Sequence, residues 1–167
     1  MYWETFKYKI KKLLEELSMN NLEDLQSYLE VITGKNFIKS AAYIEAQETL
    51  LINYYQSFEE AFEYDFNVSK SDYENYFTQS KIEKLIVEET ARLLRKYPFV
   101  QVIAIDLKFG GNDFSAEVSR EKFNSLTQTK LEELSLDDGT WQEFQNKFTS
   151  GVKNANRITL FNEFIKK

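Results

Sequence analysis

The stretch Phe99-Val-Gln-Val-Ile-Ala-Ile-Asp-Leu-Lys-Phe109 decides the fold class of this 167-residue chain. Its residues are mostly β-branched or apolar, and from Ile103 onward apolar and polar side chains alternate. This alternation is typical of a strand that buries one face, because successive side chains point to opposite sides of a sheet. The side chains expected to point inward are those of Ile103, Ile105, Leu107 and Phe109.

A hairpin loop is expected directly after this strand, because Gly110-Gly-Asn-Asp113 consists of turn-forming residues. The returning strand has three inward side chains, those of Phe114, Ala116 and Val118. With a four-residue loop Phe109 pairs with Phe114, and counting back places Asp106 opposite Glu117. Two carboxylates directly opposite each other destabilise a sheet, so a cation is expected beside them.

The first part of the chain has the spacing of helices, with apolar residues at steps of three and four. One helix is expected over residues 3–17. Asn21 is expected to cap a second helix, which Gly34 ends. A third helix is expected from about Ser40 to Tyr64.

Capping boxes predict where later helices begin. The pattern of a hydroxyl followed three residues later by a carboxylate occurs at Ser71–Glu74, Ser80–Glu83 and Thr140–Glu143. The second of these opens a strong helix that ends before Pro98, because proline disfavours helix for the residue preceding it. Ser119 is expected to cap a further helix.

The segment 157–165 is ambiguous between a helix and a third strand, and we favour the strand because a lone hairpin is marginal in water. The expected fold is therefore α+β: predominantly helical, with a small antiparallel sheet around 99–119. A single domain is expected over 1–167, with a helical part at 1–97 and a part at 98–167 in which helices pack on the hairpin.

Composition excludes many kinds of catalytic site. The chain has no cysteine and no histidine, so thiol nucleophiles, thiolate metal sites and histidine acid–base chemistry are impossible. We expect no cofactor and consider enzymatic activity the less favoured alternative. No targeting signal is visible, so a cytoplasmic location is expected. The frequent Lys, Asn, Ile, Phe and Tyr are typical of an AT-rich genome, bacterial or viral.

An acidic segment, residues 40–69, contains no basic side chain, six acids and seven aromatic residues. Its formal charge of −6 equals that of the whole chain. As a helix it would offer aromatic and one-signed charged side chains to a basic partner protein. The partner-binding residues expected on it are Glu45, Glu48, Tyr54, Glu59, Glu60, Glu63 and Tyr64. Two alternatives are a solvated outer face and neutralisation by the chain's own basic residues, at Lys81, Lys84, Arg92 and Arg95.

The predicted hairpin offers a second hypothesis, from a different class of function. Asp106 and Glu117, with Lys108 nearby, could hold magnesium for a phosphodiesterase or nuclease. Asp106-Leu-Lys108 after an apolar strand resembles the acid-x-Lys strand of restriction-type nucleases, over three residues. The alternative interpretation is that these residues form a rim of solvated charges, which protects the edge of the sheet from pairing with other strands.

The sequence favours a non-enzymatic protein-binding module, such as an inhibitor, an immunity-type protein or an adaptor, that presents an acidic aromatic helix. Direct nucleic-acid binding is not expected, because such proteins usually carry a basic patch and a high isoelectric point. No membrane binding is expected. A third possibility is a structural subunit of a homo-oligomer.

Overall fold

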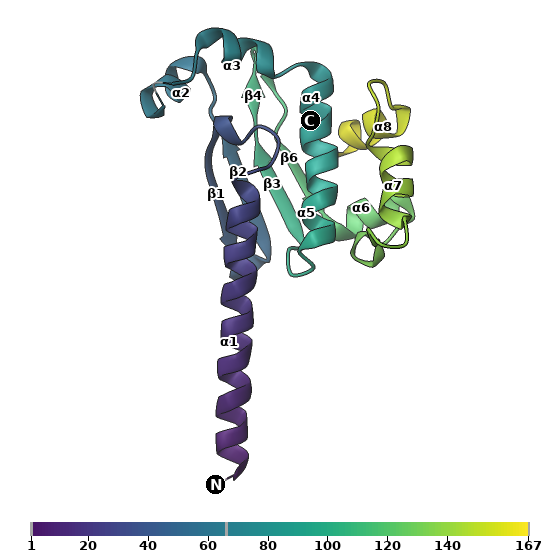
Figure 1. The fold of residues 1–167 in the computed structure, drawn as a ribbon. Helices are drawn as coiled ribbons and strands as arrows, with labels where there is room; N and C mark the ends of the chain where they lie inside the picture. The colour runs from purple at the N-terminus through teal and green to yellow at the C-terminus, as the bar shows by residue number, and fades with distance from the viewer. Residues whose placement is uncertain (1, 66, 167) are drawn as a thin grey trace. The chain divides into compact units, whose positions relative to one another are not determined.

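The structure, a computed structural model, describes residues 2–65 and 67–166, with side chains from residue 7 onward. It divides into two compact units, Met1–Lys35 and Asn36–Lys167. Figure 1 shows their helices and strands. The chain is α+β and predominantly helical, which confirms the expected fold class.

The first unit consists of one long helix, α1 (Tyr2–Leu29), followed by a turn. The prediction of two helices with a cap at Asn21 is wrong, because Asn21 lies inside α1. No glycine or proline occurs in this helix, so nothing forces the chain to leave the helical conformation there. Gly34 follows the helix end with a φ of 81°, a left-handed conformation that glycine adopts readily.

The second unit is built on a mixed four-stranded sheet. Its strands are β1 (Ile38–Ile44), β2 (Thr49–Tyr54), β3 (Val102–Asp106) and β6 (Ala116–Ser119), in the order β1-β2-β3-β6. The outer pairs are antiparallel, whereas β2 and β3 run parallel. The sheet therefore consists of two hairpins joined side by side through a parallel pair.

The prediction of a helix from Ser40 to Tyr64 is wrong. β1 and β2 occupy most of this range, and the short 3-10 helix η2 (Glu45–Gln47) joins them. Only α2 (Phe58–Tyr64) is α-helical. In β2 the buried apolar side chains recur at every second residue, at Leu50, Ile52 and Tyr54. Burial of this face on a strand outweighed the helix-forming tendency of the alanine and glutamate residues before it.

A continuous helical run lies over the sheet in Figure 1 and follows α3 (Lys70–Tyr76). It comprises α4 (Gln79–Lys84), the π-helical turn η3 (Leu85–Glu89) and α5 (Thr90–Lys96), and it ends before Pro98 as predicted. The two capping boxes predicted here are wrong. Each helix begins two residues earlier than expected, because Ser69 and Thr78 accept the capping hydrogen bonds.

The register of the second hairpin differs from the predicted one. Gly110 and Gly111 form a two-residue turn, both with positive φ, between β4 (Lys108–Phe109) and β5 (Asn112–Asp113). Pairing is displaced by two residues, so Glu117 lies opposite Ala104 and not opposite Asp106. A displacement of two keeps every side chain on its predicted face.

Three helices complete the second unit: α6 (Arg120–Thr127), α7 (Thr140–Phe148) and α8 (Ala155–Phe164), with the 3-10 helix η4 (Leu131–Glu133) between the first two. Ser119 caps α6 as predicted. The cap position of α7 is Gly139, so the capping box predicted at Thr140 is wrong.

The strand favoured for 157–165 is also wrong, because this segment belongs to α8. Asn154 caps α8 by accepting a hydrogen bond from the backbone of Arg157. Leu160 and Phe164 are buried at helical spacing. Only Ile165, just beyond the helix, forms an isolated β-bridge, with Ala116.

Two buried arginines hold connecting segments of the second unit in place. Arg157 is fully buried. It donates hydrogen bonds to the carbonyl oxygens of Thr149, Gly151 and Val152 at 2.7–2.9 Å. Its Nε lies 3.5 Å from the carboxylate of Glu83, which is also buried. The guanidinium therefore links the loop before α8 to the helix α4.

Arg120 likewise holds a connecting segment in place, at the other end of the helical run. Its Nη2 donates to the carbonyl oxygens of Leu94, Tyr97 and Val100 at 2.7–3.0 Å. Its Nη1 lies 3.1 Å from a carboxylate oxygen of Glu132. Carbonyl groups at a helix end have no hydrogen-bond partner within the helix. Arg120 therefore supplies donors to the carbonyl groups at the end of α5 and in the chain leading into β3.

Candidate functional site

The acidic residues expected on one helix lie in two separate places. Glu45 and Glu48 are exposed at the turn between β1 and β2. The other three, Glu59, Glu60 and Glu63, are on α2, which follows the far end of β2. The length of a six-residue strand, about 20 Å, separates the two groups. The negative charge of the segment is therefore divided between two surfaces.

The two tyrosines of the expected binding surface have opposite environments. Tyr54 is 1% exposed, and burial together with the nearby carboxylate of Glu89 raises the pKa of its hydroxyl. Tyr64 is 64% exposed and lies 5.8 Å from the ring of Tyr55. Tyr64 can therefore contact a partner, whereas Tyr54 belongs to the core.

The start of α2 is fixed by a cap that sequence reasoning missed. Ser57 accepts a hydrogen bond from the backbone N–H of Glu60, whose carboxylate accepts one from the N–H of Gln56 at 2.7 Å. Lys39, on β1, forms an ion pair with the same carboxylate. The pattern Ser57-Phe-Glu-Glu60 was a visible signal, but it fell inside the range assigned to a helix interior.

Acidification is expected to weaken this cap. The backbone hydrogen bond from Gln56, and then the bond from Lys39, hold the pKa of Glu60 below its ordinary value of 4.5. Its contribution to stability is therefore complete above that ordinary pKa and is lost as pH falls through the lowered one. We expect Glu60→Gln to remove this part of the pH dependence of the unfolding free energy, measured by denaturant titration between about pH 5 and pH 2.

The matched control is Glu59→Gln, which removes the same charge from the neighbouring residue. Its pH profile should follow that of the wild-type protein. If the two variants and the wild type all gave the same profile, Glu60 would have no special role in the cap.

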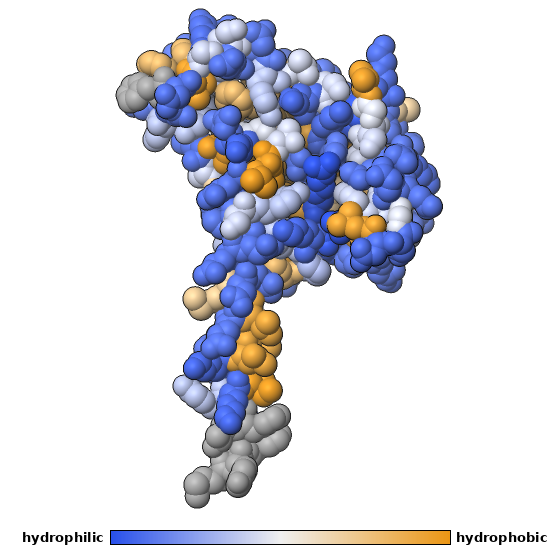
Figure 2. All heavy atoms as spheres, in the orientation of Figure 1, coloured by the Kyte–Doolittle hydropathy of each residue, from blue (hydrophilic) through white to orange (hydrophobic). Residues whose placement is uncertain are grey.

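Four exposed residues of α2 form what we call the α2 surface: Glu59, Phe62, Glu63 and Tyr64. Phe62 is 42% exposed and packs on Phe58. No ion pair is recorded for Glu59 or Glu63 with any residue in the described part of the chain. Figure 2 shows apolar and hydrophilic side chains mixed in the region of α2.

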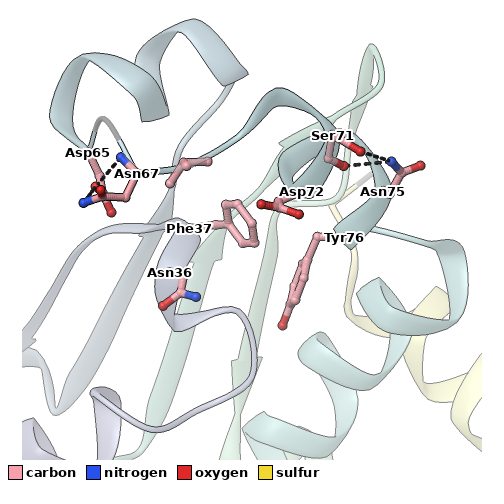
Figure 3. Close-up of a pocket in the computed structure, with 9 residues that line it drawn as sticks. Asn36, Phe37, Asp65, Asn67, Ser71, Asp72, Asn75 and Tyr76 are labelled. Atoms are coloured by element: carbon pink, nitrogen blue, oxygen red, sulfur yellow. Dashed lines mark hydrogen bonds between the residues drawn. The ribbon is translucent and has the colours of Figure 1, made fainter.

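A pocket of about 580 Å³ lies beside this helix, and we call it the α3 pocket (Figure 3). The end of α2 and the following loop contribute one wall, α3 contributes another, and Phe37 lies between them. Its lining residues are Asn36, Phe37, Asp65, Asn67, Val68, Ser71, Asp72, Asn75 and Tyr76. These residues include carboxylates, amides, a hydroxyl and rings, but no lysine or arginine.

The polar groups of the α3 pocket are held in place locally. Asp65 Oδ1 accepts hydrogen bonds from the backbone and side-chain nitrogens of Asn67 at 2.9 and 3.1 Å. Asn75 donates to the backbone oxygen and the hydroxyl of Ser71. The carboxylate of Asp72 points toward the centre of the pocket in Figure 3. The pocket is therefore a negatively charged, partly aromatic hollow.

The tyrosine of the α3 pocket already lies beside a cation. Lys81 Nζ is 4.7 Å from the ring centroid of Tyr76, and Phe37 packs on the same ring with centroids 4.7 Å apart. An electron-rich ring face attracts ammonium and guanidinium groups. The surroundings of Tyr76 thus suit basic side chains.

The two arginines considered as internal partners of the acids have other contacts. Arg92 pairs with Glu88 and Glu89 on its own helical run. Arg95 stacks over the ring of Trp141 at 4.9 Å. Among the described residues, the acidic segment has one recorded ion pair, between Glu60 and Lys39.

The hairpin carboxylates do not have the arrangement that motivated a magnesium site. Asp106 accepts a hydrogen bond from Ser115 Oγ at 3.0 Å. Glu117 is exposed, 3.9 Å from Lys166 Nζ. Lys108 lies opposite Asp113, whose pKa is lowered chiefly by its hydrogen bonds from Ser115. Among the described residues, no three or more acidic side chains are grouped in a way that could hold a metal ion.

Comparison of the chain with protein-family models, curated proteins and solved structures finds no significant match. No helix in the described ranges is both long enough and apolar enough to cross a membrane.

Proposed function

We propose that the protein is a non-enzymatic binding module for a partner protein with a basic surface, and that the α2 surface and the α3 pocket receive that partner. The observation that carries this proposal is the set of exposed carboxylates and rings on α2 next to a pocket with two aspartates. Among the residues that the structure describes, no lysine or arginine lines that pocket. A cationic side chain from outside would complete it.

The exposed rings supply the contact area of the proposed interface. Aromatic side chains are enriched in the centres of protein interfaces, because they bury a large area with few rotatable bonds. Phe62 and Tyr64 are the two large rings exposed on α2. Phe62 rests on Phe58, and Tyr64 on Tyr55, so neither ring has to be ordered entirely by the partner.

The carboxylates supply steering and specificity. Glu59 and Glu63 are one turn apart on α2, so they repel each other by a few tenths of a kcal/mol. A basic partner relieves this repulsion and is drawn to the surface at low salt. Within the pocket, a lysine or arginine of the partner would approach the carboxylates of Asp65 and Asp72 and the amides around them.

Charge reversal on α2 is expected to remove binding of a basic probe. The variant is Glu59→Lys/Glu63→Lys, and the probe is a synthetic lysine- and arginine-rich peptide followed by isothermal titration calorimetry. We expect affinity to fall at least tenfold, or about 1.4 kcal/mol, because two attractions become repulsions. The melting temperature should stay close to the wild-type value, because both side chains are exposed.

The matched control is Glu45→Lys/Glu48→Lys, which makes the same change of charge at the other end of the hairpin. It should reduce affinity far less. Equal losses in the two variants would mean that the peptide senses only net charge, and the proposed surface would be rejected. If Asp72→Asn lowers the affinity while the charges of α2 are unchanged, a cationic side chain of the peptide binds in the α3 pocket.

A further inference from the structure

The helix α1 carries an apolar face with no cover in the described structure. All side chains from residue 7 to residue 24 are exposed. Four of them form what we call the α1 stripe: Ile10, Leu13, Leu14 and Leu17, which are 41–60% exposed. Figure 2 shows hydrophobic side chains along one side of α1 and hydrophilic ones along the other.

The spacing of the stripe is that of a coiled coil. Residues 3, 6, 10, 13 and 17 are Trp, Phe, Ile, Leu and Leu, at alternating steps of three and four. This step pattern defines the a and d positions of a heptad repeat, with a at 3, 10 and 17 and d at 6 and 13. Two other large exposed side chains, Tyr8 and Met19, fall on the opposite side of the helix.

A stripe of this kind stabilises its helix only when something covers it, because isolated helices in water are marginal and most helix stability comes from packing. The intrahelical ion pairs Lys11–Glu15 and Lys12–Glu16, both at 3.9 Å and well exposed, add only tenths of a kcal/mol each. Burial of the apolar face against another surface would stabilise α1 more than these ion pairs do.

We propose that the α1 stripe pairs with the α1 stripe of a second copy of this chain, with the two helices antiparallel. The charges beside the stripe favour this occupant and this direction. The g positions of the heptads are Lys9 and Glu16, and the flanking e positions are Lys7 and Leu14. In an antiparallel pair g faces g, so Lys9 of each copy faces Glu16 of the other, which gives two complementary contacts.

A parallel pair lacks this complementarity. There g faces e, so Lys9 would face Leu14 of the second copy, and Glu16 would face Asn21. In the antiparallel pair Ile10 lies opposite Leu13 of the second copy, and Leu17 lies opposite residue 6. Apolar residues face apolar ones in either direction, and the antiparallel pair also places Lys7 opposite Leu14, so the Lys9–Glu16 contacts are what favour the antiparallel direction.

The net charge of the helix also favours self-association. Residues 2–18 contain four lysines and three glutamates, whereas the whole chain carries −6. Two copies can approach through this almost neutral helix with little repulsion. The four side chains of the α1 stripe, each burying on the order of 100 Å², give roughly 800 Å² over the two copies, which is the size of a weak, reversible interface. A micromolar dimer is the expected result.

The test is the mass of the full-length protein in solution, by sedimentation equilibrium over about 1–200 μM. The wild type should show a dimer that dissociates on dilution. Leu13→Glu/Leu17→Glu should weaken self-association at least about 100-fold, because each substitution places a charge in the apolar contact. The matched control, Tyr8→Glu/Met19→Glu, adds the same charge to exposed apolar positions off the stripe and should still dimerise.

Orientation is tested by cross-linking, because the chain contains no cysteine of its own. Mixing the single variants Ile10→Cys and Leu13→Cys under mild oxidation should yield chiefly the mixed disulfide, as the antiparallel direction requires. If each variant instead formed a disulfide with itself, the helices would be parallel, and the proposal would be overturned.

The same experiments identify other occupants of the stripe. A protein that stays monomeric at all concentrations, with the stripe protected from hydrogen exchange, would show that its own second unit covers α1. Monomers that bind vesicles of phosphatidylcholine and phosphatidylserine through the stripe would show a lipid surface as the occupant. Either result overturns the proposal. Circular dichroism of each variant checks that the helix is kept.

Discussion

Replacing Arg157 by methionine is expected to destabilise the protein by about 3–5 kcal/mol, because it breaks a buried ion pair and leaves one charge behind. Arg157 is fully buried, and its guanidinium donates to three carbonyl groups of the loop between α7 and α8. Without it the carbonyls of Thr149 and Gly151 lose this donor, that of Val152 keeps only a long hydrogen bond from Ser80, and the carboxylate of Glu83 stays buried. Denaturant unfolding monitored by tryptophan fluorescence measures the effect.

Two further variants separate the causes of this loss. Arg157→Met/Glu83→Gln should recover part of the stability, because no uncompensated charge remains. Arg157→Lys keeps the charge but lacks the planar fork that reaches several carbonyls, so it should lie between the wild type and Arg157→Met. A cost of less than about 1 kcal/mol for Arg157→Met would show that the guanidinium does not hold the loop.

Replacing Arg120 by methionine is expected to cost about 2–4 kcal/mol, somewhat less than the loss at Arg157. Arg120 donates to Leu94, Tyr97 and Val100, where the helical run ends and the chain turns toward the sheet. Its acidic partner Glu132 is one-third exposed, so water can solvate that carboxylate when Arg120 is lost. Most of the expected penalty comes from the carbonyls of Leu94 and Val100, because that of Tyr97 still accepts a hydrogen bond from the backbone N–H of Val100.

A local measurement distinguishes this role from general destabilisation. Hydrogen exchange in Arg120→Met should increase first at the amides around 94–102, before the rest of the sheet opens. Glu132→Gln is the matched control, because it removes the carboxylate and leaves the carbonyl contacts intact. If both variants lost the same stability, the ion pair and not the carbonyl contacts would be the important interaction.

The elements that the sequence predicts well are those with a strong local signal. The strand β3 follows from the alternation around Ile103 and Ile105, both buried. The end of the long helical run follows from Pro98, and the start of α6 from the hydroxyl of Ser119. In each case neighbouring residues alone contain the physical cause.

The first hairpin was missed because its local signals conflict. The alanine and glutamate residues before Thr49 favour helix, and apolar residues in this range also fit helical spacing. The alternation of Leu50, Ile52 and Tyr54 is visible only once a strand is considered. The same error placed the two acidic groups of the candidate site on one helix and hid the cap at Ser57.

Long-range contacts could not be read from the sequence at all. No local pattern indicates that Arg157 reaches Glu83, or that Asp72 and Tyr76 share a pocket with Phe37. The hairpin register failed for a narrower reason, because a Gly-Gly pair can form a two-residue turn or begin a longer loop. The charge pattern of the sequence predicted that Glu59 and Glu63 are exposed. Their location on α2 could be known only from the fold.

The parallel pairing of β2 with β3 has a consequence for how the chain acquires its structure. Thr49 pairs with Val102, about fifty residues later, so this junction closes only after the intervening helices have been made. During synthesis the first hairpin leaves the ribosome with an unsatisfied edge and an apolar face. We expect refolding to be limited by the meeting of the two hairpins, and chaperone contact to concentrate on β2 before that meeting.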